Sequence, residues 1–103
     1  MIEVLLQAER QLMMGQVDQA ERLYRQAVAA DPRNSIAVVG LARVALERDD
    51  GVGAWLLAKE ALVIDPENVA AQRLAERLEE IHAYRGQSIA ALAAERQPGR
   101  SDE

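Results

Sequence analysis

The chain has 103 residues, enough for one compact domain, and its 17 acidic and 12 basic residues give a net charge of −5, which disfavours nucleic acid and anionic membranes as partners. It has no cysteine, which excludes disulfides, thiolate metal sites and cysteine nucleophiles. Half of the residues are hydrophobic but only 3% are aromatic, which favours close-packed helices over a β-sandwich.

The first 34 residues predict two helices. Val4, Leu5, Ala8 and Leu12 recur at helical spacing, so we expect a helix from Ile2 to about Met14, ended by Gly15-Gln16. A second helix is expected from about Asp18, whose carboxylate would cap it. Its inward stripe comprises Ala20, Leu23, Tyr24, Ala27 and Val28. Pro32 cannot continue a helix and therefore ends it.

The same unit is then repeated. Asp31-Pro32-Arg33-Asn34 recurs 34 residues later as Asp65-Pro66-Glu67-Asn68. Ten residues are identical when residues 1–34 are laid over 35–68: Ile2/Ile36, Val4/Val38, Ala8/Ala42, Leu12/Leu46, Ala20/Ala54, Leu23/Leu57, Ala27/Ala61, Asp31/Asp65, Pro32/Pro66 and Asn34/Asn68. The second unit therefore predicts a helix capped by Asn34 or Ser35 that runs to about Arg48, a turn at residues 49–51, and a helix from Val52 to Ile64.

Beyond Asn68 the period weakens. Residues from Val69 to about Tyr84 predict a long amphipathic helix. Glu76 stands where the first two units have Ala8 and Ala42, so we expect no closely packed partner there, as in the capping helix of a solenoid. Residues from Ile89 to Glu95 are interpreted as a vestigial last helix, and residues 97–103 are predicted to be a flexible tail.

The small residues explain how the two helices of a unit pack. Two antiparallel helices approach closely only where side chains are small, which fits the three alanines repeated in each unit. Together with Tyr24 on the second helix and a proline that closes a 34-residue unit, they make residues 1 to about 68 resemble the tetratricopeptide repeat (TPR) family. The chain departs from that family's pattern in having no large aromatic at Val4, Val38, Gln11, Ala45 and Ala58.

The resemblance implies an all-α fold in which two TPR-type helical hairpins stack as a right-handed α-solenoid fragment, followed by a capping helix. We expect one domain over residues 1–96, with repeat one at 1–34, repeat two at 35–68, and the capping helix with a degenerate third repeat at 69–96. In this family the first helices of the repeats line a concave groove that binds another protein.

That groove is where we expect a partner to bind. Ten residues of this chain fall on it: Ile2, Leu5, Glu9, Leu12, Met13, Ile36, Val39, Arg43, Leu46 and Glu47. No lysine stands among them, so the carboxylate clamp of co-chaperone members is not inherited. The largely aliphatic stripe suits an apolar peptide or helix of a partner protein, although part of the stripe could instead belong to the core.

The second helix of repeat two predicts a further contact, because it is apolar on nearly all sides. The residues outside its inward stripe are Val52, Trp55, Leu56 and Val63. Either the segment from Ile89 to Ala94 covers them, or another chain does. As an alternative function we therefore expect a self-assembling module, a homodimer formed through these four residues.

No constellation for catalysis, cofactor binding or metal binding is present in the sequence, so we do not expect an enzyme. The single histidine, His82, is predicted to lie on the surface, and the Asp49-Asp50 pair to form a turn without the ligand spacing of a calcium loop. No apolar run approaches about 20 residues and no basic leader precedes the first helix, so we expect a cytoplasmic protein.

Overall fold

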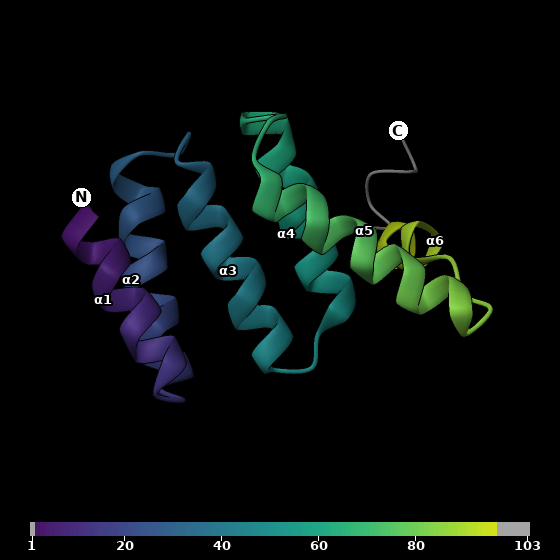
Figure 1. Ribbon diagram of the computed structural model, residues 1–103, viewed down its shortest axis with the longest axis horizontal. Coiled ribbons are helices and arrows are strands. Elements are labelled where there is room, and N and C mark those ends of the chain that lie inside the picture. The colour runs from purple at the N-terminus through teal and green to yellow at the C-terminus, as the bar shows by residue number, and fades with distance from the viewer. Residues whose placement is uncertain (1, 97–103) are drawn as a thin grey trace.

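The computed structural model describes residues 2–96, which form six α-helices and no strand. The helices are α1 (Ile2–Met13), α2 (Val17–Ala30), α3 (Ser35–Glu47), α4 (Gly51–Ile64), α5 (Val69–Tyr84) and α6 (Ile89–Arg96). Figure 1 shows α1, α3 and α5 succeeding one another along the long axis, with α2 behind α1 and α6 at the far end. The all-helical prediction is confirmed, and the tail predicted for residues 97–103 lies outside the described residues.

Each of the first two repeats is a helical hairpin, in which α1 packs on α2 and α3 packs on α4. The repeated alanines of these hairpins are fully buried: Ala8, Ala20 and Ala27 in the first, and Ala42, Ala54 and Ala61 in the second. Their small side chains allow the two helices of a hairpin to approach closely, as the sequence predicted. Further contacts between α2 and α3 and between α4 and α5 join the hairpins into one stack.

The repeated Asp-Pro-x-Asn motif builds the same corner twice. The Asp31 carboxylate accepts a hydrogen bond from the backbone N–H of Arg33 (3.1 Å), and Asp65 accepts one from Glu67 in the same way (3.1 Å). Asn34 then caps α3 by accepting from the N–H of Ala37 at 3.1 Å, and Asn68 caps α5 in the equivalent position. At both corners the motif thus ends one helix and starts the next.

The predicted cap of α2 was wrong. The helix begins at Val17, so Asp18 is already inside its first turn, whereas a capping side chain must stand before the first helical residue. The residue at the cap position is Gln16, whose side chain makes no capping hydrogen bond. The Asp18 carboxylate pairs instead with Arg48, at the end of α3.

The C-terminal part is a long helix followed by a short one. Helix α5 has the bounds that the sequence predicted, and Glu76 is exposed on it, as expected for a position without a closely packed partner. The expected last helix is present as α6, but it packs on α4 as well as on α5. Its buried residues are Ile89 and Ala93.

The prediction that His82 lies on the surface was also wrong, because its residue surface is only 9% exposed. The ring lies against the start of α4, where a Cβ at Gly51 would be 3.3 Å from His82 Cε1. Its Nδ1 lies 2.9 Å from the carbonyl oxygen of Leu78. A carbonyl oxygen can only accept, so Nδ1 donates, and the ring is accommodated as a satisfied core residue.

Candidate protein-interaction groove

Helices α1 and α3 form a hollowed face on one side of the molecule. Its larger depression, which we call the large hollow, has a volume of about 470 Å³. The residues that line it are Glu9, Leu12, Met13, Arg43, Leu46 and Glu47. All six belong to the groove predicted from the sequence. The side chain of Met13 is almost fully exposed, and Leu46 is partly exposed, so apolar surface is accessible there.

A second depression, the small hollow, lies on the same face and has a volume of about 180 Å³. Three further residues of the predicted groove line it, namely Leu5, Ile36 and Val39. Val39 is buried and therefore forms part of the wall, whereas Ile36 is largely exposed. Ile2 lines neither hollow, although it is exposed at the start of α1.

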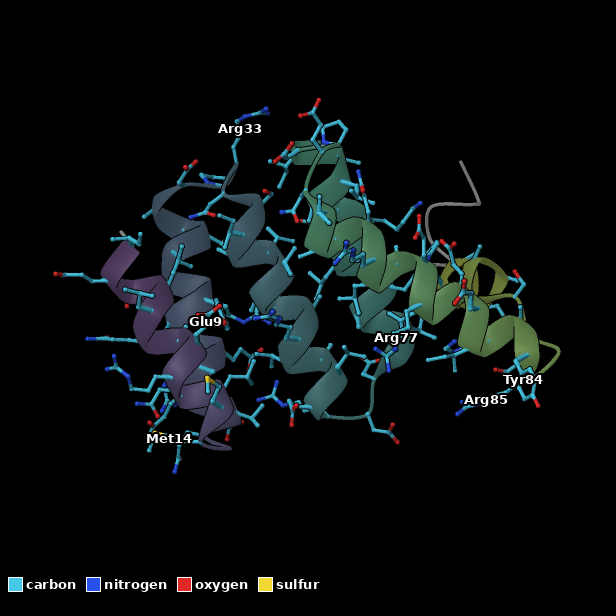
Figure 2. All side chains as sticks on the ribbon, in the orientation of Figure 1. Glu9, Met14, Arg33, Arg77, Tyr84 and Arg85 are labelled. Carbon is cyan, nitrogen blue, oxygen red and sulfur yellow. The ribbon has the colours of Figure 1, made fainter. Side chains whose placement is uncertain are left out.

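An ion pair lies between the two hollows. Glu9 Oε2 and Arg43 Nη1 are 3.5 Å apart, and both side chains are about half exposed. The two residues line the large hollow and the small hollow alike. Figure 2 shows Glu9 at the junction of α1 and α3, whereas the labelled Arg77 lies farther along the molecule, on α5. An exposed ion pair of this length is weak, so a ligand can displace it at little cost.

Tyr24, on α2, is one of the residues that line the small hollow. Its residue surface is almost fully buried, and burial raises the pKa of its hydroxyl above the ordinary value of 10.0. The positive charge of Arg43 lowers this pKa and the negative charge of Glu9 raises it, but burial is the dominant cause. The hydroxyl therefore stays protonated at neutral pH.

Sequence reasoning missed four of the residues that line the small hollow: Tyr24, Gly40, Asn68 and Ala70. Tyr24 was assigned to the inward stripe of α2, and its access to the hollow depends on the missing side chain of Gly40. Ala70 stands 34 residues after Ile36, so continuing the repeat beyond Asn68 could have identified it. Asn68 reaches the same place from the second corner, where its Nδ2 donates to Ser35 Oγ at 3.0 Å.

The four residues of the expected self-association surface do not form one open patch. Val52 and Trp55 pack against a buried cluster made of Ala42, Ala54, Leu78 and Ile89, the last of which comes from α6. The indole Nε1 of Trp55 donates to Glu79 on α5 (2.9 Å), and Lys59 Nζ lies 5.6 Å from the ring centroid. Leu56 is partly buried, whereas Val63 is 84% exposed.

The two junctions between successive hairpins differ in chemistry at equivalent positions. At the first, Arg48 pairs with Asp18 and Glu21 on α2. Hydrogen bonds from Arg25 and then from Arg48 hold the pKa of Glu21 below its ordinary value. The residues 34 positions later are Val52, Trp55 and His82. Val52 and Trp55 pack against the cluster that contains Leu78 and Ile89, and the His82 ring lies against Gly51 at the start of α4. Helix α4 is therefore apolar where α2 is charged, because α5 and α6 cover it.

Within residues 2–96, no group of three or more histidine, aspartate or glutamate side chains is placed to hold a metal ion. No helix in this part of the chain combines the length and the apolar character needed to cross a membrane.

A family model described as a tetratricopeptide repeat matches residues 5–69, which are more than half of the chain. Comparison with curated proteins and with solved structures gives no significant match.

Proposed function

The chain belongs to the tetratricopeptide repeat family, and we propose that it binds an apolar peptide or helix of a partner protein through the face formed by α1 and α3. Repeats of this family generally mediate protein–protein interaction. The observation that carries the proposal is the large hollow, whose six lining residues all come from the predicted groove. On this proposal the protein is an adaptor or scaffold rather than an enzyme, with residues 1–96 acting as one unit.

The large hollow supports this function because of its size and composition. Leu12, Met13 and Leu46 present apolar surface that water contacts in the free protein. Burying one large aliphatic side chain there would contribute about 1.5–3 kcal/mol. The unbranched side chain of Met13 adapts to ligands of different shape. Binding along one helix-lined face in this way is the usual mode by which an amphipathic helix docks into a groove.

A direct binding measurement tests the proposal. A fluorescein-labelled, 16-residue amphipathic helical peptide with leucine on one face is titrated with the protein and followed by fluorescence anisotropy. Leu46→Asp is the groove variant, because it places a charge in the large hollow at a partly exposed position. Tyr84→Asp is the control, because it places the same charge at an exposed side chain at the end of α5, outside both hollows. We expect loss of binding in Leu46→Asp alone, and equal affinity in both variants would contradict the proposal.

Homodimerisation through Val52, Trp55, Leu56 and Val63 is the alternative proposal. Its support is the exposed side chain of Val63, with Leu56 only partly buried on the same helix. Light scattering of the parent and of Val63→Glu at high micromolar concentration tests it. A dimer that dissociates in the variant would support this function, whereas a monomeric parent would contradict it.

A further inference from the structure

We infer that the segment bound by the large hollow is cationic: an amphipathic helix whose apolar anchor is flanked by lysine or arginine. This inference deepens the proposed function and rests on it, since it concerns the charge of the ligand at the same site. Its basis is the arrangement of the charged residues around the apolar floor of the large hollow.

The rim of the large hollow carries more negative than positive charge. Glu9, Arg43 and Glu47 line it together with three apolar residues. Arg43 is paired with Glu9, whereas Glu47 has no ion-pair partner within residues 2–96. With two carboxylates and one guanidinium, the lining of the large hollow carries a net charge of −1, and Glu47 is the carboxylate that is not ion-paired within residues 2–96. A ligand cation next to the apolar anchor would give it a partner, and would leave the Glu9–Arg43 pair in place.

An acidic ligand is disfavoured at the same place. It would bring its carboxylates toward Glu9 and Glu47, and like charges that meet across an interface oppose binding. Arg43 is the one cation in the lining of this hollow, so freeing it from Glu9 for an acidic ligand would leave both Glu9 and Glu47 facing that ligand. Arg73 and Arg77 lie on α5 and line neither the large hollow nor the small hollow. The net charge of −5 adds a long-range attraction for cationic partners.

The spacing of the two hollows favours a helical ligand. Leu5 lines the small hollow and Leu12 lines the large hollow, seven residues further along α1. Seven residues of α-helix span about 10.5 Å, so a ligand helix lying along α1 would fill both hollows with apolar side chains at positions i and i+7. Basic residues next to position i+7 would then approach the carboxylates of the large hollow.

Two synthetic peptides test the inference. Both are alanine-rich helices with leucine at i and i+7, and they differ only in carrying two lysines or two glutamates beside the second leucine. Binding is measured by fluorescence anisotropy at low ionic strength with the parent protein and two variants. Glu47→Lys reverses the charge at the large hollow, and Glu60→Lys makes the same change in net charge on the exposed surface of α4.

We expect the lysine peptide to bind the parent and Glu60→Lys about threefold more tightly than the glutamate peptide, the effect typical of an exposed ion pair. Glu47→Lys should abolish or reverse this preference, and about 0.5 M salt should reduce it in the parent. If both peptides bind the parent equally, or the variants behave alike, the inference on charge is wrong while the proposed function stands. If neither peptide binds the parent, the proposed function fails and this inference fails with it.

Discussion

The ring of Tyr24 on α2 occupies the space that a side chain at position 40 of α3 would need, so a Cβ added to Gly40 would overlap ring atoms. Both residues are buried at the junction of the first two repeats. The equivalent positions one repeat later carry Ala58 and Leu74, so the large residue has moved from one helix to the other. Leu74 packs against the cluster that contains Ala54 and Leu78. Each junction thus combines one bulky and one small residue at these two equivalent positions, which is compatible with close packing.

The contact between Tyr24 and Gly40 predicts that Gly40→Ala destabilises the protein. In an open helix this change would stabilise by about 1 kcal/mol through helix propensity. Here the added Cβ would overlap the buried ring, and overpacking of this kind costs about 1–3 kcal/mol, so we expect a net loss of up to about 2 kcal/mol. In a Tyr24→Ala background the same change should become neutral or stabilising. Urea unfolding of the four chains checks this, and equal effects of Gly40→Ala in both backgrounds would contradict it.

The alanines at the helix crossings carry a second prediction. Ala20 and Ala54 are fully buried inside the two hairpins, so replacing either with leucine adds three carbon atoms where no space exists. We expect each variant to lose roughly 1–3 kcal/mol of unfolding free energy, measured by thermal or urea denaturation. Ala29→Leu, on the exposed side of α2, is the control and should leave stability nearly unchanged. A parent-like melting curve for both core variants would show that these crossings are not closely packed.

Most of the fold was predictable because it depends on local sequence signals that recur every 34 residues. Pro32 and Pro66 end helices, Asn34 and Asn68 cap the next ones, and the fixed 34-residue period places the alanines on facing helices. Nine of the ten predicted groove residues line the large or the small hollow for the same reason. The 34-residue period does not predict contacts that are made in one repeat only.

The features that were missed depend on such contacts. His82 is buried because α5 packs on the start of α4. The sequence of α5 alone does not predict this contact. Asp18 was assigned to a cap because its partner Arg48 lies 30 residues away and belongs to the next hairpin. The sequence left open whether the segment from Ile89 to Ala94 or another chain covers α4, because an apolar helix face does not indicate which of the two it contacts. In the structure α6 packs on it.

The lowered pKa of Glu21 predicts an acid-dependent loss of stability at the first junction. A carboxyl group whose pKa is lower in the folded chain stabilises the fold fully above its unfolded value, here near 4.5, and this contribution is lost as the pH falls through the folded value. We expect Glu21→Gln to lower stability at about pH 6 and to have a smaller effect at about pH 3, because the parent carboxyl becomes protonated as the pH falls below the unfolded value of 4.5. Urea unfolding at both pH values measures the difference, which should shrink in about 0.5 M salt because the pair is exposed. An unchanged difference between parent and variant across this pH range would show that Glu21 does not contribute.

The docking of α6, which covers part of the apolar surface of α4, carries the last prediction. Ile89 is almost fully buried in the cluster that Val52 and Trp55 contact, and α6 has only eight residues. A helix of that length is not stable by itself, so it depends on this docking. We expect Ile89→Asp to undock α6 and to lower the free energy of unfolding by roughly 2–5 kcal/mol, the range for losing a large buried side chain.

Trp55 is the only tryptophan of the chain and reports this undocking directly. Its emission should shift to longer wavelength in Ile89→Asp because water reaches the indole, while the helical circular dichroism signal of α1–α5 is retained. The exposed surface at Val52 and Trp55 should also make the variant self-associate, raising its mass in light scattering with concentration. Ala90→Asp places the same charge on the exposed side of α6 and should behave like the parent. If Ile89→Asp shows neither the emission shift nor the increase in mass, α6 does not provide the cover that keeps this face of α4 from solvent.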